Sequence, residues 1–200
     1  MTTLVYFILQ VYWSTEMNDI LFAIWFLLPA ALSNAAPIFS AKIPALKRYD
    51  TPMDFGKEWH GHRIFGAHKT WRGLISGIIV STIALYVQQV LFVHTDWAKA
   101  ISGPIDYAAL PVLLLGPAFA IGALGGDAIE SFFKRALRIK PGGSLIPFDQ
   151  LDYIIGSVLV SLFFVILSPI HYVWIFVIWF VMHVVVSYVG YLLKFKDAPI

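Results

Sequence analysis

The stretch from Gly126 to Gly156 reads GDAIESFFKRALRIKPGGSLIPFDQLDYIIG, and hydrophobic segments flank it on both sides. Its first 27 residues, 126–152, carry side chains of both charges: Asp127, Glu130, Lys134, Arg135, Arg138, Lys140, Asp149 and Asp152. Charge beside a bilayer is costly unless a metal, a phosphate or water compensates it. We therefore interpret this charged stretch as a membrane-surface site for a metal–phosphate substrate.

The composition around this stretch is that of an integral membrane protein. Hydrophobic residues make up 59% of the 200 residues and charged residues 13%, whereas a typical soluble domain is roughly 25% charged. The mean hydropathy is +0.77. Because the chain has no cysteine, disulfides and thiolate metal sites are excluded. We expect a single all-α membrane domain over residues 1–200.

Apolar segments of roughly the length that crosses a bilayer, about 20 residues, follow one another along the chain. They predict a bundle of five transmembrane helices at residues 19–41, 74–93, 108–126, 153–168 and 172–193. Residues 4–13 are apolar and aromatic but too short to span, so we expect them to lie at the membrane interface. The spacing of Gly73 with Gly77, and of Gly122 with Gly126, predicts close helix packing.

The basic residues indicate which ends of the helices face the cytoplasm. All lysines and arginines except Lys99 lie in residues 42–73, in the charged stretch or near the C-terminus. With five crossings, these three regions are on the same side. Basic loops stay cytoplasmic in membrane proteins, so we expect two charged cytoplasmic loops, a cell-membrane location and an active site facing the cytoplasm.

Three aspartates are the candidate metal ligands. Magnesium prefers oxygen ligands, usually one or two carboxylates together with substrate phosphates. Asp149 and Asp152 are three residues apart and share a face if helical. Asp127 begins a predicted helix over residues 127–137, where an aspartate is also a common N-cap. Three aspartates around a cluster of cations favour the metal interpretation.

Two cations of the charged stretch suit a polyphosphate substrate. Lys134 follows Asp127 by seven residues, so both lie on nearly the same helix face, and Arg135 is next to it. Anchoring of the helix by snorkelling cations is the simpler explanation. Together with the aspartates, however, the pair forms the arrangement of metal and cations that phosphoryl chemistry requires.

The loop of residues 42–73 is a second basic region. Arg63, Lys69 and Arg72 supply charge, and its glycines allow close approach of a phosphate. The spacing of Gly61, Gly66 and Lys69 differs from a P-loop, and no hydrophobic strand precedes it, so we reject that motif. His60, His62 and His68 lack a cysteine or close carboxylate partner, which makes zinc the weaker interpretation.

Asn34 lies in the first span between Pro29 and Pro37. Proline removes a backbone donor, and the carbonyls it frees at membrane depth need partners or a water-filled cavity. Asn34 would contact a substrate there or hydrogen-bond another helix; the sequence leaves both alternatives open.

Several motifs in order resemble those of CTP-dependent lipid-phosphate cytidylyltransferases, and above all the short CDP-archaeol synthase family. They are Asn34-x-x-Pro37, Asp54-x-Gly56, Arg63-x-x-Gly66-x-x-Lys69-Thr70-x-x-Gly73, Gly126-Asp127, Ser131-x-x-Lys134-Arg135 and Asp149-x-x-Asp152. The motifs cover residues 34–156, and the length and five-span layout also resemble that family. A His-Gly-Gly connector of the classical phosphatidate enzymes is missing between residues 139 and 147, which favours the archaeal-type branch.

The resemblance implies transfer of CMP from CTP to a lipid phosphate, with release of pyrophosphate. The acceptor would be 2,3-bis-O-geranylgeranylglycerol 1-phosphate, giving CDP-archaeol, or phosphatidate, giving CDP-diacylglycerol. Mg²⁺ would be held by Asp127, Asp149 and Asp152, while Lys134 and Arg135 would hold phosphates. The nucleotide side would be lined by Asn34, Asp54, Lys57, Arg63, Gly66, Lys69, Thr70, Arg72 and Gly73. The expected partners are CTP, a lipid phosphate and the membrane, with no nucleic acid and with a homodimer as a possible assembly.

Two other functions remain as alternatives. Proline-broken spans also occur in transporters of small solutes or ions, but here the charges gather outside the spans and no inverted repeat is visible. A CDP-alcohol phosphotransferase would need a longer pattern of Asp, Gly and Arg that this sequence lacks.

Overall fold

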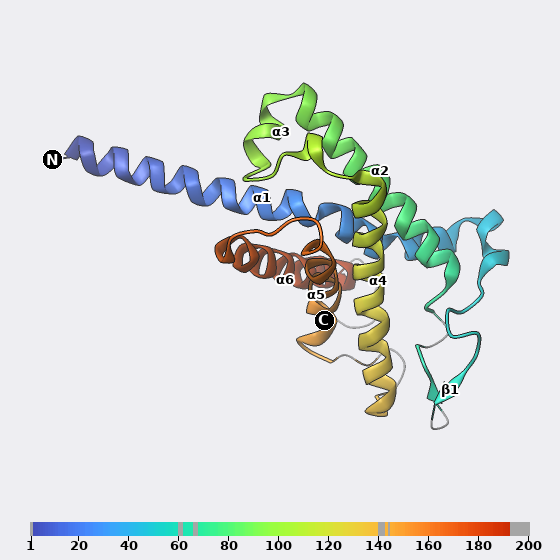
Figure 1. Ribbon diagram of the computed structural model, residues 1–200. Coiled ribbons are helices and arrows are strands. Elements are labelled where there is room, and N and C mark those ends of the chain that lie inside the picture. Colours follow the sequence, from blue (N-terminus) through green and yellow to red (C-terminus); the bar gives the residue numbers. More distant parts are fainter. Residues whose placement is uncertain (1, 60–61, 66–67, 140–142, 144, 193–200) are drawn as a thin grey trace.

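Figure 1 shows the computed structural model, which describes residues 2–59, 62–65, 68–139, 143 and 145–192, with side chains from Met17 onward except that of His62. The described residues are mostly helical. The α-helices are α1 (Thr2–Lys42), α2 (Trp71–His94), α3 (Asp96–Ile101), α4 (Val112–Ala136), α5 (Phe148–Ser161) and α6 (Pro169–Leu192). Two 3₁₀ turns are η1 (Pro44–Tyr49) and η2 (Tyr107–Ala109), and β1 (Glu58–Trp59) pairs antiparallel with β2 (His62–Arg63).

Helix α1 is longer than the sequence predicts. Residues 4–13, expected as a separate interfacial segment, continue the same helix as the first span, and Figure 1 shows this end of α1 projecting beyond the other helices. Pro29 and Pro37 both lie inside α1 without ending it. Neighbouring helices and side chains can satisfy the carbonyls that a proline frees at membrane depth.

The core forms where α1 meets the other long helices. Phe22, Phe26, Leu85, Phe119 and Ile154 are almost fully buried there. Side-chain hydrogen bonds to main-chain carbonyls join the helices as well: Gln88 Nε2 to Trp25 at 2.6 Å, Ser81 Oγ to Gly116 at 2.8 Å and Trp179 Nε1 to Ala23 at 2.9 Å. Such bonds satisfy polar groups that have no access to water.

Glycines bring α4 and α5 into backbone contact. A Cβ on Gly122 would meet the carbonyl of Gly156, and one on Gly126 would meet the carbonyl of Asp152. A Cβ on Gly77 would lie 2.6 Å from Leu124 Cδ1. The packing predicted from the glycine spacing is therefore confirmed, and it places the start of α5 directly against α4.

The five predicted spans are only partly matched. Within the part of the chain that the structure describes, four helices are long and apolar enough to cross a membrane: Met17–Lys42, Trp71–His94, Val112–Ala136 and Pro169–Leu192. The fourth predicted span, residues 153–168, instead lies partly in α5, which has 14 residues and ends at Ser161. The third span, expected at residues 108–126, begins at Val112 and continues to Ala136. Much of the expected charged loop is therefore helical, because α4 extends through it and α5 begins before its end.

Candidate active site

A cavity of about 530 Å³ lies where α1, α2, α4, α5 and α6 meet the segment before α2. We call it the acidic cavity. Eight of the site residues that the family resemblance implies line it: Asn34, Lys69, Thr70, Arg72, Gly73, Asp127, Asp149 and Asp152. Residues separated by more than 100 positions in the chain thus share one site.

Three carboxylates in this region lie close enough to hold one metal ion. Asp127, Glu130 and Asp152 each offer an oxygen, and these oxygens lie within 4.8 Å of one another. Asp127 and Glu130 share a face of α4 because they are three residues apart. Asp152 joins them from α5 because Gly126 lets the two backbones touch. Clustered carboxylates repel one another unless a cation compensates them, and carboxylate oxygens are the ligands that Mg²⁺ prefers, so this set fits a magnesium ion.

Asp149 has different partners. Its Oδ2 accepts a hydrogen bond from Lys134 Nζ at 2.7 Å, and its Oδ1 accepts one from the Leu145 amide at 3.0 Å. Lys134 Nζ also lies 2.9 Å from Glu130 Oε1. Lys134 therefore links the carboxylate cluster to Asp149 through a partly buried ion-pair network.

Lys69 reaches the same cluster from the first loop. Its Nζ donates to Asp127 Oδ2 at 2.5 Å, although 58 positions separate the two residues. The backbone holds Lys69 there, because its carbonyl accepts from the Met53 amide at 2.7 Å. Thr70 next to it caps α2, its Oγ1 accepting from the Gly73 amide at 3.2 Å. The cap fixes where α2 begins and thereby where Lys69 enters the cavity.

Arg72 is a second cation of the acidic cavity. Its Nη2 lies 2.9 Å from Asp50 Oδ1, and its side chain is only 9% exposed. Its buried Nε has no hydrogen-bond partner within the described part of the chain. A buried donor without a partner is costly, so Arg72 has unused capacity to bind an anion entering the cavity. Asn34 lines the same cavity from α1.

Asp54 and Arg63 organise the hairpin next to the cavity. Arg63 Nη2 donates to Asp54 Oδ1 at 2.5 Å, and the Asp54 carboxylate also accepts from the amides of Gly56 and Phe65. Burial opposes ionisation of Asp54, but these hydrogen bonds prevail and lower its pKa from 3.8 to about 2. Lys57 is exposed in the same hairpin, and Gly66 lies outside the described residues. The structure therefore does not place Asp54 or Lys57 in the lining of the acidic cavity.

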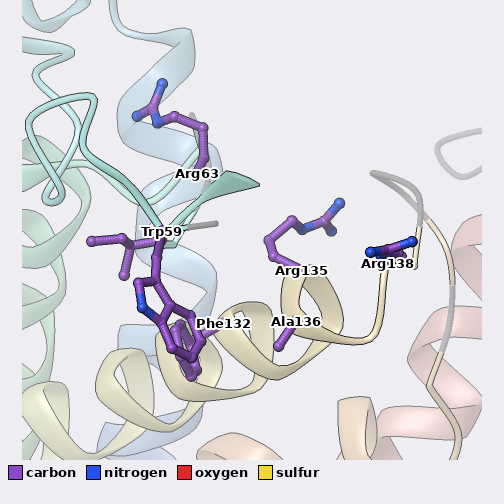
Figure 2. Close-up of a pocket in the computed structure, with 7 residues that line it drawn as sticks. Trp59, Arg63, Phe132, Arg135, Ala136 and Arg138 are labelled. Carbon is purple, nitrogen blue, oxygen red and sulfur yellow. The ribbon is translucent and has the colours of Figure 1, made fainter. Parts of the chain in front are cut away.

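Arg135 lies on another side of α4 from Lys134. It lines a second cavity, of about 330 Å³, together with Trp59, Arg63, Ile64, Phe132, Ala136 and Arg138 (Figure 2). Its Nη1 donates to the Ile139 carbonyl at 2.9 Å. Lys134 pairs instead with Asp149, which lines the acidic cavity, so the two adjacent cations of the sequence motif contact different parts of the structure.

Two residues of the site were missed by the sequence interpretation. Glu130 could have been found, because its spacing from Asp127 and Lys134 puts all three on one helix face. His183 lines the acidic cavity from α6. Nothing in the sequence around His183 predicts this, since only tertiary packing brings α6 to the cavity.

The chain is similar to known proteins over most of its length. Residues 17–200 match the family model CarS-like, CDP-archaeol synthase. The CDP-archaeol synthase of Pyrococcus furiosus is 37% identical over 142 residues, 70% of this chain and 74% of that protein. That of Pyrococcus abyssi is 33% identical over 186 residues, 92% of this chain and 99% of that protein.

A solved structure is similar as well. It is described as "Structural insight into an intramembrane enzyme for archaeal membrane lipids biosynthesis" and is 29% identical, with a TM-score of 0.64. The similarity covers 82% of this chain and 92% of the solved one. Since the family model spans nearly the whole sequence and the relatives match over most of their length, this chain belongs to the CarS-like CDP-archaeol synthase family.

Proposed function

We propose that this protein is a membrane-embedded CTP-dependent cytidylyltransferase that converts an archaeal-type diether glycerol phosphate and CTP into CDP-archaeol and pyrophosphate. The observation that carries the proposal is the acidic cavity. Asp127 and Asp152 line it, Glu130 lies close to both carboxylates, and with the cations Lys69 and Arg72 they form a site for a metal-bound triphosphate. Membership of the family supports this function and gives the transporter alternative no support.

In this reaction an oxygen of the lipid phosphate attacks the α-phosphorus of CTP. A new phosphorus–oxygen bond forms, the bond to the bridging oxygen of the β-phosphate breaks, and pyrophosphate leaves with that oxygen and its electron pair. No protein nucleophile is needed, so the chain contributes positioning and electrostatic stabilisation. The residues must therefore hold two anionic substrates against their mutual repulsion.

We assign Mg²⁺ to Asp127, Glu130 and Asp152, and Asp149 would be a further ligand. When bound, the ion supplies Lewis-acid stabilisation of phosphate oxygens. The chain's own cations complement this role. Lys69 and Arg72 flank the N-terminus of α2, where backbone amides favour anions. We assign the triphosphate to this side of the cavity, where Thr70 and Gly73 form the start of the helix; Asn34 lines the cavity from α1.

The acceptor lipid would enter from the apolar side of the same cavity. Pro37, Ile38, Ala41, Leu74 and Leu124 line it there. Ile38 is 62% exposed at the surface of α1, in a segment long and apolar enough to cross a membrane. An apolar wall next to carboxylates suits a substrate with a phosphate head and a hydrocarbon tail.

We propose that α5 also crosses the membrane as a short fifth span. Asp149, at its start, pairs with Lys134 near the end of α4. Beyond its end, His171 in the first turn of α6 lies 3.5 Å from Asp19 of α1, so α5 runs back towards the opposite end of the bundle. This path places Lys42, Trp71, Ala136 and Phe148 at one end, which the distribution of basic residues assigns to the cytoplasm. A homodimer stays a prediction from the sequence.

Pyrophosphate release from detergent micelles tests the function. We expect release with CTP, Mg²⁺ and an unsaturated diether glycerol phosphate, loss of release with EDTA, and recovery with added Mg²⁺. Release with diacyl phosphatidate alone would change the acceptor to an ester lipid. If folded protein releases no pyrophosphate with either lipid, the cytidylyltransferase assignment is wrong.

A further inference from the structure

The second cavity, between the β1–β2 hairpin and the end of α4, has a chemistry unlike that of the acidic cavity. Trp59 stacks on Phe132 with ring centroids 5.3 Å apart, and this contact pins the hairpin to the helix (Figure 2). Arg63, Arg135 and Arg138 line the space of about 330 Å³ that remains. None of its described lining residues is a carboxylate. We call this space the arginine pocket.

The arginine pocket is separate from the acidic cavity because it lies on another face of α4. Asp127, Glu130 and Lys134 recur at intervals of three and four residues and share one face. Phe132, Arg135 and Ala136 share a different face, next to the exposed apolar side chains Ile129 and Phe133. The pocket therefore lies between the polar loops and the part of α4 that would face lipid tails.

Among the described residues, a carboxylate pairs with only one of the three arginines of the pocket. Arg63 is paired with Asp54, but Arg135 donates to a main-chain carbonyl. Arg138 forms no ion pair with any described residue. Like charges gathered at one place repel one another, so an anion bound between Arg135 and Arg138 would be stabilised by both.

At the end of α4, Arg138 adopts a left-handed backbone conformation that costs free energy. The Ile139 amide donates to the Lys134 carbonyl at 2.9 Å and the Arg138 amide to the Arg135 carbonyl at 3.0 Å. These two bonds form a Schellman motif, whose left-handed position is usually a glycine. Arg138 occupies it with φ +58°. A residue without a branched Cβ tolerates this conformation at a cost of about 1 kcal/mol, and here the arginine side chain is brought over the pocket (Figure 2).

We propose that the arginine pocket binds the phosphate group of an anionic ligand, either an anionic lipid of the surrounding membrane or free phosphate. Guanidinium groups bind phosphate oxygens through paired hydrogen bonds. The apolar side chains beside the pocket place it where lipid headgroups meet water. The site lies outside the cavity assigned to catalysis, so the proposal does not depend on the proposed function.

Thermal unfolding of the full-length protein in detergent tests this site. The probes are a short-chain phosphatidylglycerol, phosphatidylcholine of the same chain length, and inorganic phosphate. We expect one of the two anionic probes to raise Tm, and phosphatidylcholine to raise it less. Arg138→Asn removes the charge while accepting the left-handed φ, and it should weaken probe binding about tenfold, which corresponds to the loss of one charged hydrogen bond. Arg48→Asn removes a cation from the first loop and should leave binding unchanged.

A second pair of variants keeps the test independent of the end of α4. Ala136→Glu places a carboxylate in the pocket, whereas Ala136→Gln adds nearly the same volume without charge. The proposal is supported if Ala136→Gln still binds the anionic probe and Ala136→Glu does not. A dependence on Arg138 seen with phosphatidylglycerol identifies a lipid as the source, and one seen with inorganic phosphate identifies a soluble ligand. The proposal is wrong if each anionic probe binds Arg138→Asn as well as it binds wild type. It is also wrong if each anionic probe binds Ala136→Glu as well as it binds Ala136→Gln.

Discussion

The acidic cavity and the arginine pocket share α4 but differ in how their charges are compensated. At the acidic cavity, the carboxylates of Asp127 and Asp149 each pair with a lysine: Lys69 Nζ lies 2.5 Å from Asp127 Oδ2, and Lys134 Nζ lies 2.7 Å from Asp149 Oδ2. In the arginine pocket, Arg135 and Arg138 face the space without a described carboxylate. The comparison teaches that net charge alone does not identify a phosphate site. A site for a metal-bound polyphosphate needs both signs, whereas a site for a bare phosphate group needs only cations.

The largest expected effect is at Asp127. Asp127→Asn removes one carboxylate of the cluster and the partner of Lys69, so pyrophosphate release should fall by at least about 100-fold. Asp96→Asn, which changes a fully exposed aspartate in α3, is the matched control and should retain full turnover. Wild-type turnover in folded Asp127→Asn protein would remove this carboxylate from catalysis.

The neighbouring cations Lys134 and Arg135 test whether the two cavities function separately. Lys134→Gln leaves Glu130 and Asp149 without their common cation, and turnover should fall by about 100-fold, with a loss of stability as well. Arg135→Gln should reduce turnover by less than about tenfold, because its side chain lines the other cavity. Steady-state pyrophosphate release measures both variants. If turnover falls equally in the two variants, both cavities bind the nucleotide, as the sequence motif alone implies.

Glycines of α4 test how far the acidic cavity depends on helix contact. Gly122→Ala drives a methyl group into the backbone of α5 and should destabilise the protein by about 1–3 kcal/mol. Gly125→Ala meets no atom within 4 Å and should be neutral or slightly stabilising. Thermal unfolding in detergent compares them. Similar Tm values for the two variants would contradict the close α4–α5 contact.

The smallest expected effect concerns the hairpin that lines the arginine pocket. The pKa of Asp54 is about 2 in the folded chain, below its ordinary value of 3.8. The unfolded chain therefore takes up the proton first as the pH falls. The stabilisation by Asp54 is complete above about pH 4 and is lost as the pH approaches 2. The difference in Tm between wild type and Asp54→Asn should narrow over this range. A difference independent of pH would show that the ionised carboxylate contributes nothing.

The sequence was sufficient for the local features of the site. The low fraction of charged residues predicts a membrane protein, and the motif spacing predicts that Asp127 and Lys134 share a helix face. The spacing also predicts Glu130 on that face, although it was not singled out. By contrast, no local pattern predicts that Asp149 accepts the amide of Leu145 and pairs with Lys134. These hydrogen-bond partners of Asp149 depend on where the N-terminus of α5 packs against α4.

The sequence by itself determined the membrane class, the helical character, the order of the motifs and the family resemblance, because periodicity, composition and spacing are properties of neighbouring residues. Only the tertiary structure decided which carboxylates meet, that Lys69 reaches Asp127, that α5 stops after 14 residues, and that Arg135 lines a second cavity. These features depend on backbone contact at glycines and on helix ends, and both are set by packing between segments far apart in the chain.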